Sequence, residues 1–307
     1  MSPEKTPTRR TCAHMVVHEL LVETQPEYRE RRLAVEEDTR NSIATGRAMA
    51  VAAKLIEIPV VVHVVHRTDD EDISDAQVAS QVKALNRDFR ARNADKSKVP
   101  AAWKSLVTDT KIQFALASKD PEGKATSGIT RTATTVASFG LDNTVKSKKT
   151  GGVDPWPTDR YLNFWVCSLG GNPPLLGYAQ FPGGPAATDG VVMLHTAFGT
   201  QGSAQAPYNK GRTATHEVGH FLNLRHIWGD RNDCNGNDLV ADTPPAQGAN
   251  MGKPKFPHIT CNNGPNGDMY MNYMDYVDDD AMVMFTVGQV ARMNAALAGP
   301  RKKLAGL

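Results

Sequence analysis

The chain has 307 residues, of which 40% are hydrophobic and 22% charged, and its formal net charge is +2 at pH 7. This composition is typical of a globular protein with one large domain and an appendage, or with two domains. The balanced charge gives no indication of nucleic-acid binding, and the lack of any run of 18 apolar residues argues against a membrane span.

Residues 1–54 predict a separate segment of one or two exposed helices with little core. Charged residues alternate along it, and Leu20, Leu21, Leu33 and Val35 recur at helical spacing. The pattern leaves two interpretations open, a solvated helical arm and a regulatory segment.

Residues 55–307 predict strands that alternate with helices. The first strand, over 58–65, is almost entirely β-branched, which favours burial on both faces. A helix over about 75–89 follows, because Ser74 or Asp75 can cap it and apolar residues recur along one face. Further strands are expected over 111–117, 129–135, 161–168 and 190–195.

Two more helices are predicted in the C-terminal part, over 212–222 and over 287–297, the second with Thr286 as a possible cap. Between them, Gly, Pro, Asn and Asp dominate as far as Met282, so this stretch is expected to be irregular. An ordered α/β half and a loop-rich half predict a substrate cleft between them.

A metal-ligand pattern lies in the run His216-Glu-Val-Gly-His-Phe-Leu-Asn-Leu-Arg-His226. On a helix, His216 and His220 share a face and can bind one metal ion, and Glu217 can reach a water on that metal. His226 lies off this face, so the chain must leave the helix and turn back to supply a third nitrogen. Three neutral imidazoles and a water form the open coordination of a catalytic zinc ion.

The four cysteines are unevenly placed. Cys234 and Cys261 bracket a loop rich in Gly, Asn and Pro, and a disulfide between them would constrain this loop and indicate an oxidising compartment. Cys167 ends an apolar run and is predicted to be a buried thiol. Cys12 lies alone near the N-terminus.

Five blocks occur in the following order: Tyr161-Leu-Asn-Phe-Trp-Val-Cys-Ser-Leu-Gly170, Leu176-Gly-Tyr-Ala-Gln-Phe-Pro-Gly183, Tyr208-Asn-Lys-Gly-Arg-Thr-Ala-Thr-His-Glu-Val-Gly-His220, Asp242-Thr-Pro-Pro245 and Asn272-Tyr-Met-Asp-Tyr276. With the strand at 58–65 they span most of residues 55–298. Together they resemble the metzincin metallopeptidases, and within that clan the pappalysin or cytophagalysin family that includes ulilysin.

The resemblance implies an α/β (α+β) catalytic domain over residues 55–307. Its upper half would hold a twisted, mainly parallel sheet with helices and the zinc-binding helix, and its irregular lower half would end in a C-terminal helix. The family's extended motif has glycine where this chain has Asn223. Asparagine tolerates a positive φ better than other non-glycine residues, so the turn that returns His226 to the metal is expected to survive.

The resemblance also implies roles around the metal. A zinc ion would polarise the scissile carbonyl and activate its bound water, and Glu217 would accept the water proton and deliver it to the departing amine. Met274 would form the apolar floor under the zinc ligands, and the phenol of Tyr276 would hydrogen-bond the tetrahedral oxyanion.

Two further sites are implied by the resemblance. Relatives place an aspartate at the base of the S1′ pocket, where it selects arginine or lysine, and this position corresponds to Asp279, with Asp278 as the alternative. A solvated loop is the plainer interpretation of these adjacent carboxylates. Calcium is implied in the oxygen-rich loop that starts at Asp230, with Asp238 and Thr243 as ligands, although the spacing alone suggests only polar turns.

The family's latency segments carry a cysteine, which suggests that residues 1–54 form an inhibitory pro-segment and that Cys12 is a fourth zinc ligand in the latent form. An incidental exposed thiol is the alternative. If the enzyme prefers to cut before arginine, self-cleavage is expected ahead of Arg40 or Arg47.

The leading hypothesis is therefore a secreted, zinc-dependent endopeptidase that acts on proteins or peptides on the N-terminal side of Arg or Lys. No signal peptide is visible, because Met1 to Arg10 is polar and basic. Two alternatives are a zinc-binding but inactive adhesion or inhibitory module, and a zinc hydrolase of another substrate class. The sequence leaves the oligomeric state open.

Overall fold

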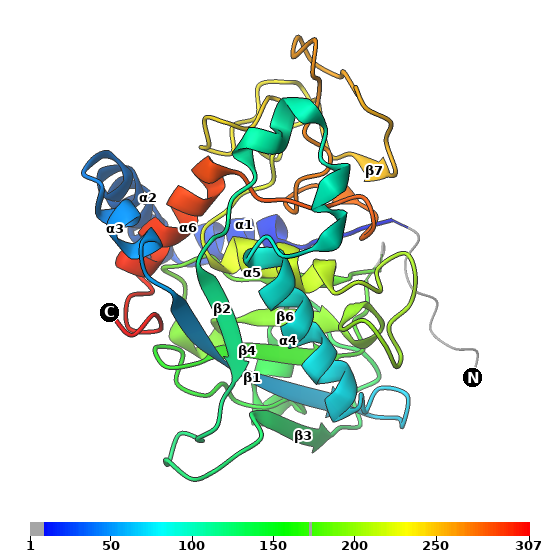
Figure 1. The fold of residues 1–307 in the computed structure, drawn as a ribbon. Coiled ribbons are helices and arrows are strands. Elements are labelled where there is room, and N and C mark those ends of the chain that lie inside the picture. Colours follow the sequence, from blue (N-terminus) through cyan, green and yellow to red (C-terminus); the bar gives the residue numbers. More distant parts are fainter. Residues whose placement is uncertain (1–8, 172–173) are drawn as a thin grey trace.

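The computed structural model describes residues 9–171 and 174–307 (Figure 1). The polar residues 1–8, on which the expectation about a signal peptide mostly depends, lie outside this part. Three helices lead the chain: α1 (His14–Thr24), α2 (Pro26–Ala44) and α3 (Arg47–Ala52). Among the described residues, no helix combines the length and the apolar character that crossing a membrane requires.

The rest of the chain contains the predicted strands and helices with small shifts at their ends. The strands and α-helices are β1 (Ile56–His66), α4 (Asp75–Phe89), β2 (Ile112–Leu116), β3 (Ile129–Ala133), β4 (Leu162–Cys167), β5 (Gly177–Ala179), β6 (Val191–Leu194), α5 (Arg212–Phe221), β7 (Met251–Gly252), β8 (Tyr276–Val277) and α6 (Val287–Ala298). Short 3₁₀ helices are η1 (Ala94–Lys98), η2 (Ala101–Leu106), η3 (Thr144–Lys146), η4 (Lys148–Thr150), η5 (Ala186–Thr188) and η6 (His195–Ala197).

The main sheet has the strand order β2-β1-β4-β6-β5, and β3 also pairs with β1. Every pairing in it is parallel except that of β5 with β6, which is antiparallel. The predicted α/β architecture with a mainly parallel sheet is therefore confirmed. The sequence analysis missed β5 as a strand, because it has only three residues and is defined by its partner across the sheet.

Side chains of β4 alternate between two cores. Phe164 and Val166 join the larger core with the buried faces of α4 and α5, whereas Trp165 and Cys167 join a second core on the opposite side. Cys167 is a fully buried thiol, as predicted. Because α5 packs against β5 and β6, the histidine helix lies directly against the edge of the sheet.

The N-terminal helices are less exposed than predicted. In α2, a stripe at helical spacing is buried, formed by Tyr28, Arg32, Val35, Thr39 and Ser42. Most of this stripe is polar, so an apolar pattern in the sequence could not reveal it. Figure 1 shows α2 and α3 beside the C-terminal helix α6, and both contact it.

Candidate active site

The three histidines of the motif meet at one point. His216 and His220 lie on one face of α5, and their Nε2 atoms are 3.1 Å apart. His226 brings its Nε2 to 3.2 Å from that of His216 and to 3.1 Å from that of His220. All three side chains are buried. Such a triangle of nitrogens is the donor set of a three-histidine zinc site.

A left-handed turn at Asn223 returns the chain to this point. Asn223 has φ +75°, the conformation predicted for it. The amide of Asn223 donates to His220 O (2.9 Å), and the amide of Leu224 donates to Gly219 O (2.9 Å). These bonds end the helix in the way that a glycine cap would, so replacement of the family glycine leaves the turn intact.

The second nitrogen of each imidazole is held by an oxygen acceptor. Nδ1 of His216 contacts Tyr273 O at 2.7 Å, and Nδ1 of His220 contacts Leu224 O at 2.8 Å. Nδ1 of His226 contacts the carboxylate of Asp230 at 2.5 Å. A proton on each Nδ1 satisfies these acceptors and leaves the three Nε2 lone pairs free to face a metal ion.

The electrostatics of the site agree with this arrangement. Burial and the neighbouring imidazoles lower the pKa of His216 and of His220 well below the usual value, so both rings are neutral at pH 7. Neutral imidazoles are the form that binds zinc. The residues present therefore fit a catalytic zinc ion.

Cys12 faces the same point from the other side. Its Sγ and the ring nitrogens of the three histidines all lie within 4.8 Å of one another. Cys12 forms a parallel bridge with Gly177 of β5. Thr11 O accepts from Leu176 N (3.1 Å), and Ala13 N donates to Gly177 O (3.3 Å). The N-terminal segment thus lies along the edge strand as an additional strand would.

Glu217 is fully buried beside this cluster. Its Oε2 accepts a hydrogen bond from Cys12 Sγ (3.4 Å), while its Oε1 has no protein partner. Burial raises the pKa of Glu217 to about 8. A β-carbon at Gly177 would lie 3.3 Å from Glu217 Cγ and 2.9 Å from Val192 O, so a glycine gives the edge strand room beside the carboxylate.

Met274 and Tyr276 both lie close to the histidine helix. A β-carbon at Gly219 of α5 would come within 2.4 Å of Met274 Sδ, so the methionine packs directly against the histidine helix. The Tyr276 ring lies 4.9 Å from the ring of His226 and 5.7 Å from that of His216. Its hydroxyl donates to Cys12 O (3.1 Å), so it can donate a hydrogen bond to a carbonyl oxygen lying beside the metal ligands.

Asp279 is buried at the start of α5, whereas Asp278 is partly exposed. Asp279 Oδ2 accepts from the backbone amides of Lys210 (2.7 Å) and Arg212 (3.2 Å). Its Oδ1 accepts from Nη2 of Arg10 at 2.6 Å. Two amides thus fix the carboxylate at the helix N-terminus, and its second oxygen binds the cationic side chain of Arg10.

Arg10 is buried against Asp279 and is 1% exposed. Its Nη1 donates to Thr213 Oγ1 (2.9 Å), and its Nε donates to Val277 O (3.2 Å). The guanidinium carbon lies 4.8 Å from the centre of the Tyr208 ring. Each guanidinium nitrogen therefore has its own acceptor, and an aromatic ring lies against the group.

The loop that was expected to bind calcium is closed by the predicted disulfide between Cys234 and Cys261. Asp238 and Thr243 lie together in it, since Thr243 Oγ1 donates to Asp238 Oδ2 at 2.7 Å. Burial raises the pKa of Asp238 to about 7.

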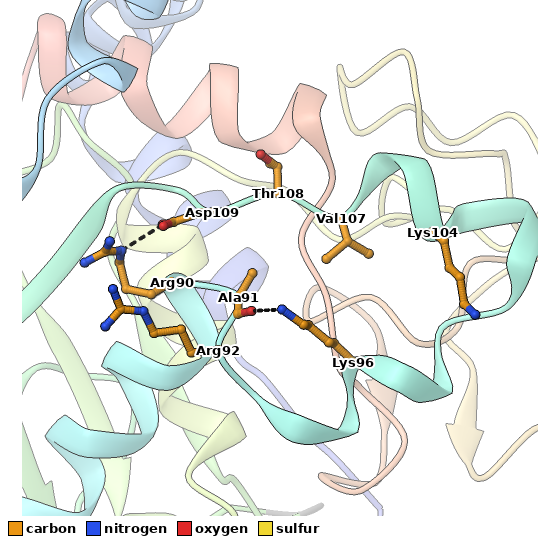
Figure 2. A pocket seen from close by; sticks show the side chains of 8 residues that line it. All are labelled: Arg90, Ala91, Arg92, Lys96, Lys104, Val107, Thr108 and Asp109. Carbon is orange, nitrogen blue, oxygen red and sulfur yellow. Dashed lines mark hydrogen bonds and ion pairs between the residues drawn. The ribbon is translucent and has the colours of Figure 1, made fainter.

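An open hollow of about 530 Å³ lies elsewhere, lined by Arg90, Ala91, Arg92, Lys96, Lys104, Val107, Thr108 and Asp109 (Figure 2). Asp109 is paired with Arg90, and Lys96 donates to the carbonyl of Ala91. None of the residues around the metal ligands lines this hollow. At the metal ligands themselves, the N-terminal segment occupies the space.

Sequence reasoning missed several residues of the site. Arg10 and Thr213 were not singled out, although an arginine two residues before Cys12 could have been matched to a pocket that selects basic side chains. His14 was missed as well, and its ring stacks on that of His220 at 3.9 Å. No local signal connects Arg292 to the turn at Asn223, where its Nε donates to the backbone oxygen at 2.8 Å.

Comparisons with known proteins agree with this geometry. Residues 146–298 match the family described as pregnancy-associated plasma protein-A. An extracellular metalloprotease of Pyricularia oryzae is 32% identical over 263 residues, which cover 83% of this chain and 80% of that protein. An extracellular metalloprotease of Colletotrichum graminicola is 42% identical over 133 residues, or 40% of this chain and 45% of that protein.

Two solved structures are also similar. A mutant of promirolysin from Tannerella forsythia is 46% identical with a TM-score of 0.88, over 96% of this chain and 97% of that one. Mature mirolysin from the same organism, in complex with a cleaved peptide, is 50% identical with a TM-score of 0.80, over 82% of this chain and 96% of that one. The chain belongs to the pregnancy-associated plasma protein-A (pappalysin) family of metzincin metallopeptidases and is a metalloendopeptidase.

Proposed function

We propose that this metalloendopeptidase cuts peptide bonds on the N-terminal side of arginine and lysine, and that residues 1–46 hold it latent through Cys12. The observation that carries the proposal is the position of Arg10. Its guanidinium is buried against Asp279, and Arg10 lies two residues before the thiol that faces the metal ligands. The buried position of this basic side chain supports a preference for arginine or lysine in substrates.

His216, His220 and His226 would hold the zinc ion, which supplies Lewis acidity to the scissile carbonyl when bound. Glu217 then removes a proton from the attacking water and passes it to the leaving amine nitrogen. Tyr276 donates a hydrogen bond to the oxygen that gains negative charge in the transition state. Met274 supports the histidine helix by packing against it.

Substrate selection follows from the acceptors around Arg10. A guanidinium can donate to Asp279, Thr213 and Val277 O at the same time, whereas the ammonium of a lysine is a single point charge. We therefore expect both basic residues to be accepted and arginine to be preferred. The substrates would be proteins or peptides, because the edge strand β5 can pair with an extended peptide backbone, as it does with residues 11–13.

Latency follows from the position of Cys12. Its thiol faces the three histidine nitrogens, where it would take the place of the attacking water, and its hydrogen bond to Glu217 would engage the general base. Burial raises the pKa of the Cys12 thiol well above the usual value, and coordination by a metal ion would offset this effect by stabilising the thiolate. The thiol and water would compete for one coordination position.

Activation is proposed to occur ahead of Arg47 rather than Arg40. Arg40 lies inside α2, where the backbone is hydrogen-bonded, whereas Arg47 follows a turn at Gly46 with φ +75°. Both arginines are exposed. Because α3 contacts α6, we propose that it stays with the catalytic domain, which moves the expected boundary from residue 54 to residue 46.

Calcium is proposed at the loop of Asp238 and Thr243. A buried carboxylate whose pKa burial raises to about 7 would be stabilised in its charged form by a bound cation, and backbone carbonyls would have to complete the shell. Calcium is then expected to raise the melting temperature of the wild-type chain and not that of Asp238→Asn. An equal shift in both proteins would exclude this site.

Secretion is proposed from the extracellular relatives.

Digestion of an unstructured protein, with the cuts mapped by mass spectrometry, tests the proposed function. The processed enzyme is expected to cut before arginine and lysine, and Glu217→Ala is expected to produce no cuts. Asp279→Asn should lower kcat/KM for arginine substrates by about 100-fold, because it removes the buried charge partner. Asp278→Asn, the same change one residue away, should keep the preference. Loss of the preference in Asp278→Asn alone, or cuts without regard to basic residues, would refute the assignment.

A further inference from the structure

The second N-terminal helix, α2, is held by charged groups that lie away from the thiol. Glu36 accepts from Nη2 of Arg292 through both carboxylate oxygens, each at 2.6 Å. The Arg292 side chain is 2% exposed and that of Glu36 is 13% exposed. This is a shielded ion pair between α2 and the C-terminal helix α6. Removing one partner of such a pair costs more stability than breaking a pair on the surface.

The same arginine reaches the metal-binding turn. Nε of Arg292 donates to Asn223 O (2.8 Å), and Asn223 Nδ2 donates to Thr39 Oγ1 of α2 (3.3 Å). One side chain of α2, Thr39, therefore contacts the turn that returns His226 to the site, and a second, Glu36, is linked to it through Arg292. The asparagine that replaces the family glycine supplies one of these contacts, which a glycine could not make.

A third group of contacts lies nearer the cleft. The guanidinium of Arg32 lies 4.4 Å from the centre of the Phe181 ring, donates to Pro182 O (2.9 Å) and pairs with Glu36 (2.7 Å). Arg31 Nε donates to Gly183 O at 2.7 Å. These contacts hold α2 against the segment that follows β5.

The contacts of α2 and those of Cys12 lie on different elements. Cys12 is held by β5 and Glu217, whereas α2 is held by α6, the turn at Asn223 and the segment around Phe181. We propose that α2 is a second anchor of the pro-segment that does not depend on the thiol. The fragment 1–46 then stays docked after the bond ahead of Arg47 is cut and acts as a product inhibitor.

This inference rests on the proposed function, since it concerns the regulation of the same site. Cleavage in the turn between α2 and α3 leaves every contact described above intact. Activity is therefore expected to follow dissociation or further digestion of the fragment, and to lag behind cleavage.

Hydrogen exchange in the intact chain tests the anchor without any need for catalysis. The background is Glu217→Ala, so that the chain cannot process itself. Cys12→Ser is expected to leave the protection of amides in residues 26–44 within about threefold of the parent. Glu36→Gln is expected to lower it at least about tenfold, because it leaves the Arg292 charge without its buried partner. Glu37→Gln, an exposed neighbour on the same helix, should change nothing.

The opposite pattern overturns the inference. If Cys12→Ser alone removes the protection of residues 26–44, the thiol is the anchor and α2 only follows it. If Glu36→Gln leaves the protection unchanged, the pair of Glu36 with Arg292 does not anchor α2, and the inference fails as well. Neither result bears on whether the chain is a peptidase.

Self-processing of the wild-type chain provides a second measurement. Samples taken over time are divided between a denaturing gel, gel filtration with mass spectrometry, and a peptide cleavage assay. In the wild type and in Glu37→Gln, fragment 1–46 should co-elute with the remainder and activity should lag behind cleavage. In Glu36→Gln the fragment should separate, and the lag should shorten by about tenfold or more. Equal, immediate separation in all three proteins would refute the second anchor, whereas the absence of any peptide cleavage would instead refute the proposed function.

Discussion

At the scale of single residues, two positions in the histidine motif determine whether the helix can end where it does. Asn223 takes a left-handed conformation with φ +75°, and Gly219 leaves room for Met274 Sδ. The conformation of Asn223 and the space at Gly219 are both needed because His226 must return toward the first two histidines within six residues. They explain why small or turn-forming residues occupy these positions between the metal ligands.

Substitutions at Asn223 separate its backbone role from its side-chain role. Asn223→Ala should lower the free energy of unfolding by about 1–2 kcal/mol relative to Asn223→Gly, because a β-carbon is strained at this φ and alanine has no side chain that offsets the strain. Urea denaturation of both variants in a Glu217→Ala background measures the difference. Equal stabilities would mean that the turn relaxes to another conformation.

Lys146 is a buried base away from the active site. Its Nζ donates to Thr188 O (2.7 Å) and lies near the rings of Trp165 and Tyr178. Burial lowers the pKa of Lys146 from 10.5 to about 7. Between pH 7 and pH 10.5 the unfolded chain therefore binds a proton that the folded chain has released, so stability rises with pH in this window and the burial penalty is fully present below pH 7.

The wild-type chain should thus gain about 2 kcal/mol of stability between pH 7.5 and pH 9 relative to Lys146→Met. Chemical denaturation at several pH values measures this slope. The exposed control Lys148→Met should keep the wild-type slope. A wild-type slope no steeper than that of Lys146→Met would mean that Lys146 stays charged in the folded chain.

The sequence could predict that the three histidines meet beside Glu217, because the four residues lie within eleven positions on one helix and one turn. It could not identify Arg10, which reaches Asp279 across 269 positions of the chain, or Thr213, which looks like an ordinary helix residue. Such contacts depend on how distant segments pack and leave no local pattern.

At the scale of elements, the histidine helix α5 is held at both ends by side chains from other segments. Asp279 accepts the amide of Arg212 at its N-terminus. At its C-terminus, Arg301 Nε donates to Phe221 O (2.6 Å), and its Nη atoms pair with Asp189 at 2.7 and 2.9 Å. An anion at the first turn and a cation at the last turn both complement the helix dipole.

Arg301→Gln should therefore lower the free energy of unfolding by about 3 kcal/mol, since it leaves a helix carbonyl and a shielded carboxylate without their donor. The adjacent exposed residue provides a control, and Lys302→Gln should stay within about 0.5 kcal/mol of the wild type. Denaturant titration compares the three proteins. A cost for Arg301→Gln as small as that of Lys302→Gln would show that α5 does not need this anchor.

Elements with a strong local pattern were predicted close to their observed ends. In α4, Ser74 accepts from Gln77 N as expected of a cap, and in α6 Thr286 forms a capping box with Gln289. The short strand β5 and the polar stripe of α2 were not predicted. A three-residue strand has no visible alternation, and the burial of Arg32 depends on partners far away in the sequence, such as Phe181 and Pro182 O.

At the scale of the whole molecule, the active site lies between an ordered sheet and the irregular C-terminal part. The sheet supplies the edge strand β5 and supports α5, while the C-terminal part supplies Met274, Tyr276 and Asp279. The N-terminal helices cover the junction between the two. Both halves must be in place before the three histidines face one point, so metal binding is expected to report on the fold as a whole.

The most direct test of zinc binding by the three histidines is a measurement of the zinc content of the purified chain. The account predicts one zinc ion per chain in the wild type and in Glu217→Ala, and its loss in His220→Ala. In the processed enzyme, a chelator should abolish peptide cleavage and added zinc should restore it. Wild-type protein without stoichiometric metal, or turnover that persists in the chelator, would contradict the central claim.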